Sequence, residues 1–287
     1  MDAQGAIIRM GGVARRSEVI EAVGRTEFDR AVAQREISRS SRGIYVSRFP
    51  DQARLIAYEA GGVLSHLAAA RRWNIGLTVR LERWDVTVPR NAVRRSLPAL
   101  ARLHYRDIPA DDVEDNCTTV LRTVLDCLRT APPHLALAVL ESAAESRRVD
   151  MAEVRTRVVN LRGAGSGRAR RILSWYDPRA CPPLESALRG ILLNAGIDRF
   201  QPQFEVWDGS RKVATTDLGD PETGILLEAD SFLNHGARDQ LARDAARYNE
   251  LVALGFRVLR FTYPPIAAGN DWVVKIVRRT LATHDRS

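Results

Sequence analysis

The chain has 287 residues, of which 45% are hydrophobic, so it can bury the cores of two or three small globular domains. Its formal charge of +8 and its isoelectric point near 10.0 favour a polyanionic partner, because clustered cations gain free energy by releasing the counterions condensed on nucleic acid. The basic residues are almost all arginine, a bias that a GC-rich genome also produces, so the charge alone does not require a nucleic-acid partner.

Cysteine spacing and hydropathy argue against several classes of protein. Cys117, Cys127 and Cys181 are odd in number and have no C-x-x-C spacing, which argues against a disulfide framework and against a zinc site. No signal peptide is visible, and no stretch approaches the roughly 20 uncharged apolar residues that span a bilayer. We therefore expect a cytoplasmic protein with no membrane partner.

The first domain is expected over residues 1–50. The sequence predicts a short apolar helix, a helix from an N-cap at Ser17 to Gly24, and a helix over "EFDRAVAQREI" capped by Thr26. The segment "SRSSRGIYVS" is typical of a hairpin that turns at Gly43. This order of elements is that of a winged helix-turn-helix, which places one helix in the major groove of DNA and its wing on phosphate or the minor groove.

Double-stranded DNA is the partner that this domain predicts, because arginine and glutamine can contact the edges of guanine and adenine. Winged helices also bind proteins, and that alternative stays open. The expected DNA contacts are Arg25, Arg30, Gln34 and Arg35 on or beside the recognition helix, and Arg39 and Arg42 on the wing.

A middle α+β domain with a linker is expected over residues 51–175. The segment "VRLERWDVTVPR" alternates as a strand does, and two amphipathic helices are predicted on either side of Pro132 and Pro133. The basic, glycine-rich stretch 162–171 is predicted to be a flexible linker. The histidines of this region are far apart in sequence, so we expect them to be structural and not metal ligands; they are His66, His104 and His134.

Three segments of the middle domain, "GGVLSHLAAARRW", "DVTVPR" and "RTVLDCLRT", follow the winged helix in this order. They resemble segments of actinobacterial AbiEi-type abortive-infection antitoxins, over roughly residues 5–150. The resemblance implies that the first domain binds promoter DNA, and it suggests a cognate toxin or another defence protein as a further partner. It assigns no chemistry.

The third domain is expected over residues 176–287. It begins with a helix after Pro183, followed by the strand "RFQPQFEVW" and by two strands joined near "GDPETG". An amphipathic helix ending at Gly255, the strand "FRVLRFTY" and a closing helix complete it. This order is the common core of restriction-type PD-(D/E)xK nucleases. The predicted fold class is therefore α/β for this domain, and multi-domain α+β for the whole chain.

Acidic residues lie at the ends of two neighbouring strands of this domain. If Asp217 and Glu228 flank a short hairpin, their carboxylates can meet, and hard oxygen ligands with open water positions suit magnesium. Glu228 and Asp230 share one face of their strand because side chains alternate. Turns and strand ends often carry such acids, so an ordinary structural role is the alternative. Glu185 also has one, because an acid in the first turn of a helix is stabilised by the helix dipole.

The motifs "PPLES", "TTD", "EAD", "NHG", "RDAAR" and "GFRVLRFT" occur in order between positions 182 and 262. They resemble an endonuclease-like family of unknown function that is related to very-short-patch-repair endonucleases. The resemblance implies phosphodiester hydrolysis with Mg²⁺ or Mn²⁺ held by Asp217, Glu228 and Glu185.

The same resemblance suggests roles for other residues. Asp230 stands where most nucleases of the superfamily carry a lysine that orients the attacking water, and His235 is the candidate general base. Arg243, Arg247 and Arg260 are expected to bind DNA phosphate, although Arg247 and Asp244 can equally form a structural salt bridge.

Two functions compete at this point. In the first, the protein is a DNA endonuclease of a bacterial defence or repair type. In the second, it is an AbiEi-type antitoxin or transcriptional regulator whose nuclease-like domain does no chemistry. Retained carboxylates favour the first, because carboxylates that face DNA phosphate weaken binding unless a cation lies between them.

Overall fold

The computed structural model describes residues 1–76, 79–92, 100–181, 183–230 and 238–284, without the side chains of residues 238–242. The chain divides into two compact units. One unit is formed by Met1–Arg72 with Arg80–Thr123, and the other by Trp73–Val79 with Val124–Ser287. The fold is mixed, with helices and three sheets in the described residues, so the predicted multi-domain α+β class is confirmed.

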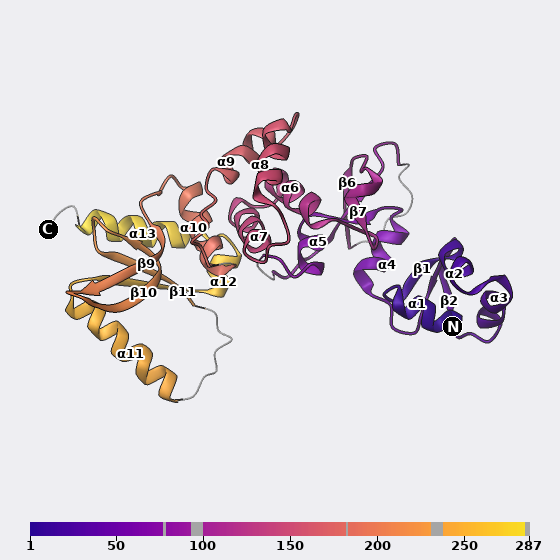
Figure 1. The fold of residues 1–287 in the computed structure, drawn as a ribbon, viewed down its shortest axis with the longest axis horizontal. Helices are drawn as coiled ribbons and strands as arrows, with labels where there is room; N and C mark the ends of the chain where they lie inside the picture. The colour runs from indigo at the N-terminus through magenta and orange to yellow at the C-terminus, as the bar shows by residue number, and fades with distance from the viewer. Residues whose placement is uncertain (77–78, 93–99, 182, 231–237, 285–287) are drawn as a thin grey trace. The chain divides into compact units, whose positions relative to one another are not determined.

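The first unit begins with three helices and a small antiparallel sheet (Figure 1). The helices are α1 Ala3–Arg9, α2 Arg16–Val23 and α3 Arg25–Ala33, and the strands β1 Val13–Arg15, β2 Ser38–Ser41 and β3 Ile44–Val46 pair in the order β1-β3-β2. Ile7, Val19, Phe28 and Ile37 are fully or almost fully buried between them. The expected order of helices and hairpin is present, with β1 as an additional strand.

The expected helix caps at Ser17 and Thr26 are wrong. α2 begins at Arg16, because the carboxylate of Glu18 accepts the backbone N–H of Arg15 at 2.7 Å and fixes the first turn there. α3 begins at Arg25 after Gly24, whose φ of +83° is easy only for glycine. Both predicted caps therefore lie inside helices.

The rest of the first unit is built around a five-stranded sheet of order β6-β5-β4-β8-β7. A hydrogen bond joins the segments "GGVLSHLAAARRW" and "DVTVPR": the hydroxyl of Thr87 donates to that of Ser65 at 2.8 Å. The elements are α4 Gln52–Glu59, β4 Val63–Leu64, α5 His66–Arg72, β5 Trp84–Val88, β6 Ala101–Tyr105, the 3-10 turn Ala110–Asp112, β7 Val113–Glu114 and β8 Cys117–Thr118.

Helices lead into the second unit. They are α6 Val120–Thr130, which begins in the first unit, α7 Pro133–Glu145, α8 Met151–Asn160 and α9 Ser166–Leu173. The predicted break at Pro132 and Pro133 is confirmed, because α6 ends before these residues and α7 starts at the second.

The flexible linker predicted over residues 162–171 is wrong. α9 starts within it at Ser166, and Arg129 of α6 donates hydrogen bonds to the carbonyl oxygens of Arg162 and Ala164, at 3.2 and 2.6 Å. Gly165 lies so close to α6 that an added Cβ would be 2.6 Å from the carbonyl oxygen of Arg129. The glycine therefore permits close packing and does not mark a flexible segment.

A four-stranded sheet with helices on both faces ends the second unit. The strands β9 Gln201–Asp208, β10 Arg211–Asp220, β11 Ile225–Asp230 and β12 Arg257–Thr262 have the order β12-β11-β10-β9, and only β11 and β12 are parallel among these pairs. The helices are α10 Leu184–Asn194, α11 Arg238–Ala253, α12 Tyr263–Ala267 and α13 Asp271–His284. α12 was not predicted.

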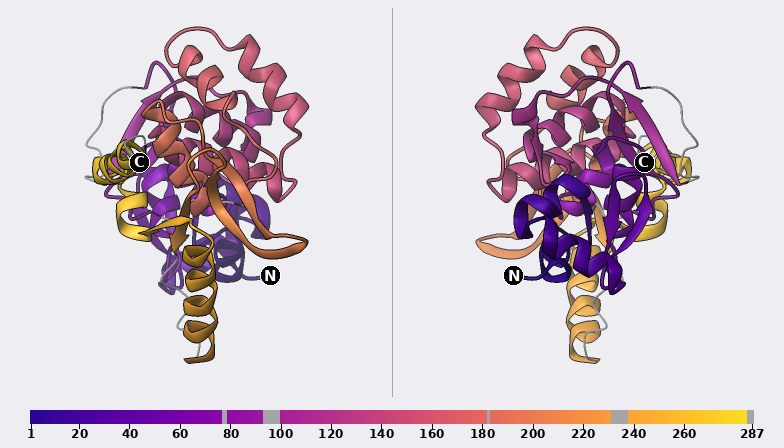
Figure 2. Two further views of the ribbon diagram at one scale, coloured as in Figure 1. Left: turned by 90° about the vertical axis from the view of Figure 1, so that its left-hand side faces the viewer. Right: turned by 90° about the vertical axis from the view of Figure 1, so that its right-hand side faces the viewer.

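Two apolar layers cover this sheet. Leu188, Leu227 and Val277 belong to the layer made with α10, α12 and α13, and Leu226 and Leu251 belong to the layer made with α11. Figures 1 and 2 show α13 and α11 on opposite sides of the strands. Within the described residues, no helix is both long enough and apolar enough to cross a membrane.

Candidate active site

Asp217 and Glu228 lie side by side where β10 and β11 stop pairing. The antiparallel register ends at Leu218 and Leu227, and these two acids are the next residue on each strand. Asp217 Oδ2 accepts the backbone N–H of Ala229 at 2.6 Å. The carboxylate thus stands in for the backbone carbonyl that would accept this N–H group in a continued strand pair. The hairpin therefore places both predicted acids at one point of the sheet.

Glu185 reaches the same region from the first turn of α10. Its side chain is only 3% exposed, and its Oε2 accepts a hydrogen bond of 2.5 Å from Gln203 Nε2. Its Oε1 is buried without a hydrogen-bond partner among the described residues, although the backbone N–H of Cys181 is near enough to lower the pKa of this carboxyl group. A buried acceptor without a partner is costly, which points to a missing donor or cation at this atom.

Gln203 is a site residue to which the sequence assigned no role. It lies in β9 between Pro202 and Phe204, whose partners Leu218 and Thr216 flank Asp217 on β10. Its φ of +52° is left-handed, which is rare for a residue other than glycine and is found where the surroundings impose it. Gln203 thus links the helix that carries Glu185 to the strand that faces Asp217.

A buried ion pair fixes α10 against α7. Arg189, one turn after Glu185, pairs with Glu141 of α7, and both side chains are almost fully buried. Arg189 Nη1 also donates to the carbonyl oxygen of Trp175 at 2.7 Å, and Glu141 Oε1 accepts the N–H of Asp177 at 3.0 Å. These contacts hold the helix, and with it Glu185, in place.

Two arginines neutralise the acids of β11. Arg247 of α11 places its Nη1 3.1 Å from Glu228 Oε1. Arg260 of β12 holds Asp230 with two contacts, Nε to Oδ2 at 2.8 Å and Nη2 to Oδ1 at 2.9 Å. Both arginines were expected to bind phosphate, and in this structure both bind carboxylates. Among the described residues, the salt bridge of Arg247 is with Glu228 and not with Asp244, the structural partner considered for it.

Burial shifts the protonation of these acids. It raises the pKa of Glu185 to about 8, with the charge of Asp217 adding to the effect and the hydrogen bond from Gln203 opposing it. It raises the pKa of Glu228 to about 7, again with Asp217 adding to the effect and Arg247 opposing it. The pKa of Asp217 is raised by burial and held down by the N–H of Ala229. The positive charges and hydrogen bonds around the cluster therefore compensate only part of the negative charge of its carboxyl groups.

A hard divalent cation fits this set of donors. Across the described residues, no three His, Cys, Asp or Glu side chains are already arranged as a metal site. The unpartnered oxygen of Glu185, the raised pKa values and the all-carboxylate donors nevertheless match what Mg²⁺ or Mn²⁺ requires. Glu185, Asp217 and Glu228 would hold the ion once Arg247 moves. His235, the expected general base, lies outside the described residues.

The arginines expected to read DNA differ in their availability. Arg30 is bound by Glu27 and Glu36, at 2.7 and 2.9 Å, and also donates to Gln34. Arg39 donates to the carbonyl oxygen of Ser41 at 3.1 Å, within its own hairpin. The side chains of this set that are exposed to solvent are Arg25, Gln34, Arg35, Arg39 and Arg42 in the first unit and Arg243 on α11.

A buried histidine pair in the first unit was missed by the sequence analysis. The rings of His66 and His104 stack with centroids 3.7 Å apart, and His104 Nε2 lies 2.8 Å from Asp85 Oδ1. Burial, with the nearby His104 adding to it, lowers the pKa of His66 to about 3. His66 is therefore neutral, which agrees with a structural role. The pairing was hidden because the two residues are far apart in sequence.

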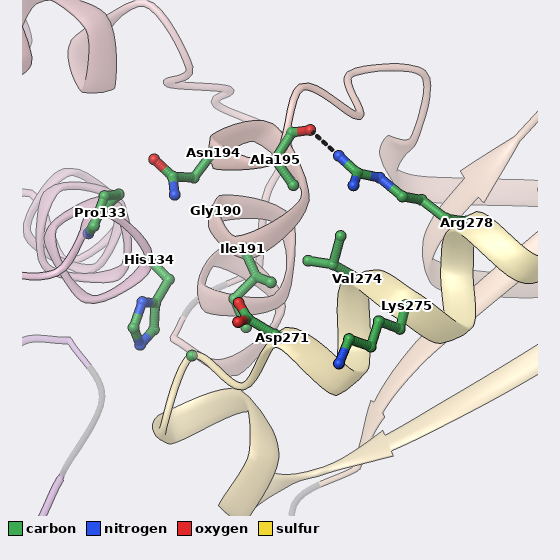
Figure 3. Close-up of a pocket in the computed structure, with 11 residues that line it drawn as sticks. Pro133, His134, Gly190, Ile191, Asn194, Ala195, Asp271, Val274, Lys275 and Arg278 are labelled. Carbon is green, nitrogen blue, oxygen red and sulfur yellow. Dashed lines mark hydrogen bonds between the residues drawn. The ribbon is translucent and has the colours of Figure 1, made fainter.

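A cavity of about 410 Å³ lies in the second unit between α7, α10 and the α12–α13 turn (Figure 3). Asn194, Lys275 and Arg278 supply much of its polar lining, and Arg278 donates to the carbonyl oxygen of Ala195 at 2.8 Å. Among the described residues that line it, none was predicted to belong to the active site.

Comparison of the chain with models of known protein families gives no match, and comparison with curated proteins gives none either. The function has to be inferred from the residues of the site.

Proposed function

We propose that this protein binds double-stranded DNA and hydrolyses its phosphodiester bonds with Mg²⁺ or Mn²⁺. The observation that carries the proposal is the position of Asp217, whose charge acts on both Glu185 and Glu228, so that three carboxyl groups from one helix and two adjacent strands influence one another. One of them has a buried oxygen without a partner in the described structure. Carboxylates that are both crowded and buried are stabilised by a cation, and a divalent cation is the one that serves phosphoryl chemistry.

Each residue of the site has a role in this proposal. Bound metal would polarise the scissile phosphate and lower the pKa of an attached water molecule. Glu185, Asp217 and Glu228 bind the ion, while Arg247 and Arg260 provide positive charge beside the phosphate. Asp230 is held by Arg260 and keeps that guanidinium group in the site. His235 is the proposed base, by resemblance alone.

The remaining parts of the chain are proposed to select and hold the DNA. Residues 1–50 would act as the winged helix-turn-helix, with Arg25, Arg35 and Arg42 exposed on it. Residues 51–175 would form the AbiEi-like middle domain, and residues 176–287 the nuclease-like domain. A cytoplasmic location is part of this proposal, because the cysteines are odd in number and lack C-x-x-C spacing.

A specific observation favours the second candidate function, an AbiEi-type antitoxin or transcriptional regulator. Arg247 and Arg260 already neutralise Glu228 and Asp230, so the face of the site is less repulsive to DNA than free acids would be. Such a protein would bind its promoter, and a cognate toxin or another defence protein, without cutting DNA.

Cleavage assays separate the two functions. Purified protein is incubated with linear, supercoiled, single-stranded and mismatched DNA in the presence of Mg²⁺, Mn²⁺ or a chelator. We expect metal-dependent cutting that is lost in Asp217→Asn and Glu228→Ala, while both variants still bind duplex DNA. Glu222→Gln is the matched control, because Glu222 lies in the same hairpin and pairs with Arg199 at the surface. Equal cutting by wild type and the two site variants refutes the nuclease proposal.

A further inference from the structure

We propose that Arg247 is an internal counterion, which a divalent cation displaces from Glu228 and which then binds DNA phosphate beside Arg260. This inference rests on the proposed function and adds to it a coupling between the metal and the DNA. It concerns the two arginines and the tyrosine between them, Tyr248.

The ion pairs occupy atoms that a metal would need. Arg247 donates to Glu228 Oε1 at 3.1 Å, and Glu228 is only 7% exposed. A dication bound by this carboxylate would lie within a few ångströms of the guanidinium group, and two positive charges at that separation repel each other strongly in a partly buried site. Bound metal and the Arg247–Glu228 pair therefore exclude each other.

The ring of Tyr248 contacts the guanidinium groups of both arginines and can hold a displaced arginine beside the site. The guanidinium carbons of Arg247 and Arg260 lie 4.9 and 4.5 Å from the centre of its ring, and Arg247 Nη2 donates to its hydroxyl at 3.1 Å. Such cation–π contacts are worth about 0.5–2 kcal/mol. An arginine that loses its carboxylate can therefore pivot on the ring and remain beside the site.

Metal binding removes the net negative charge of the fully ionised cluster. Four carboxylates, on Glu185, Asp217, Glu228 and Asp230, face two guanidinium groups, so the fully ionised cluster has an excess of two negative charges. One dication brings the net charge of the cluster to zero. An anion that approaches the exposed edges of the two guanidinium groups then meets no net negative charge.

Phosphate of the DNA backbone is the anion that fits. Both arginine side chains are partly exposed, at 30% for Arg247 and 47% for Arg260, and a planar guanidinium binds phosphate oxygens in pairs. Because binding free energies are reciprocal, metal raises the affinity for DNA by the same factor by which DNA raises the affinity for metal. Arg247 would thus oppose metal binding alone and favour metal binding together with DNA.

The test uses the full chain and Ca²⁺, with DNA cleavage monitored separately. Ca²⁺ is titrated calorimetrically into wild type, Arg247→Gln and Arg211→Gln without DNA. We expect Arg247→Gln to bind Ca²⁺ about twofold to tenfold more tightly than wild type, because the competing ion pair is gone. Arg211→Gln is the matched control. It removes an arginine that pairs with Glu250 and Asp208 in the same unit, and its Ca²⁺ affinity should equal that of wild type.

The second measurement is the affinity for duplex DNA, by fluorescence anisotropy with Ca²⁺ and with a chelator. The added affinity that Ca²⁺ confers should fall about twofold to tenfold in Arg247→Gln, with little change in the chelator. Opposite effects on metal and on DNA are the signature of the proposal, because a purely structural arginine would weaken both.

Several results overturn the inference. They are unchanged or weaker Ca²⁺ binding by Arg247→Gln, an equal loss of DNA affinity with and without Ca²⁺, and no Ca²⁺ binding by wild type. If circular dichroism shows that Arg247→Gln is unfolded, Arg247→Met is measured in its place with the same expectations. Expected titrations without DNA cleavage in Mg²⁺ would refute the nuclease function and leave the counterion exchange standing.

Discussion

Gln203 donates a hydrogen bond of 2.5 Å to one carboxylate oxygen of Glu185, while the other oxygen is buried without a partner in the described structure. The amide thus donates a hydrogen bond to one of the two oxygens of a carboxyl group that the fold buries away from water. Burial raises the pKa of Glu185 to about 8, so the group is mostly protonated at neutral pH.

The first prediction concerns the stability of Glu185→Gln as a function of pH without metal. The pKa of Glu185 in the folded protein, about 8, exceeds its ordinary value of 4.5, so its favourable contribution is complete below pH about 4.5 and is lost as the pH rises through about 8. Glutamine does not ionise. The variant should therefore gain on wild type between pH about 5 and 9, and be more stable by about 1–3 kcal/mol at the upper end.

Urea unfolding at pH about 5, 7 and 9 measures this difference. Glu222→Gln, at an exposed acid, serves as the control and should show no such trend. Excess Mg²⁺ should remove the advantage of Glu185→Gln at high pH, because only the carboxylate can bind the ion. A constant difference across the pH range would show that Glu185 does not titrate as described.

The second prediction is that metal affinity rises with pH. The pKa values of about 7 for Glu228 and about 8 for Glu185 mean that metal must displace protons from both groups at neutral pH. Calorimetric titration with Ca²⁺ in buffers of different ionisation enthalpy should report the release of about one to two protons at pH about 7, falling toward none at pH about 9. Proton release that does not depend on pH would contradict these protonation states.

The third prediction concerns the ion pair that holds α10. Replacing Arg189 by methionine leaves Glu141 buried without its counterion, which should cost about 3–5 kcal/mol of unfolding free energy. The double variant Glu141→Leu with Arg189→Met should recover most of this loss, because no charge then remains buried. Denaturant unfolding of the single and double variants gives the comparison. If the double variant is as unstable as the single one, the packing of the arginine stem matters more than its charge.

The fourth prediction separates the arginines of the first unit. Arg25 and Arg42 are exposed, whereas Arg30 is held by Glu27 and Glu36. Arg25→Ala and Arg42→Ala should each reduce the slope of log affinity against log salt by about 1 if they contact phosphate. Arg30→Ala should change that slope less, since its charge is already compensated. Anisotropy titrations across a salt series decide this, and a full loss in Arg30→Ala alone would assign recognition to that residue.

Local signals carried much of the fold prediction. Pro133 and Gly255 mark the ends of elements wherever the chain lies in space, and the alternation of Leu227, Glu228 and Ala229 defines a strand and its faces. The failures were of another kind. The glycines near position 165 suggested flexibility because the packing of Gly165 against Arg129 is not visible in sequence.

The sequence predicted the positions of the acidic residues of the candidate site, but not the ion pairs that its arginines form. Asp217 and Glu228 flank a hairpin, so their meeting follows from neighbouring strands. Arg247 and Arg260 reach the site from a helix and a strand that are distant in sequence, and only the packing of α11 and β12 determines that they pair with Glu228 and Asp230. The left-handed backbone of Gln203 likewise depends on its surroundings and has no local signature.

The structural role of Asp217 affects how the sequences of related proteins should be interpreted. Its carboxylate accepts the N–H of Ala229 in an interior strand of the sheet, so a lineage that abandoned catalysis would still be selected to keep an acceptor there. Glu185 is the reverse case, since glutamine would relieve a burial cost and lose only the ability to ionise. Under the proposed nuclease function, glutamine at 185 would therefore mark an inactive relative more reliably than aspartate at 217 would mark an active one.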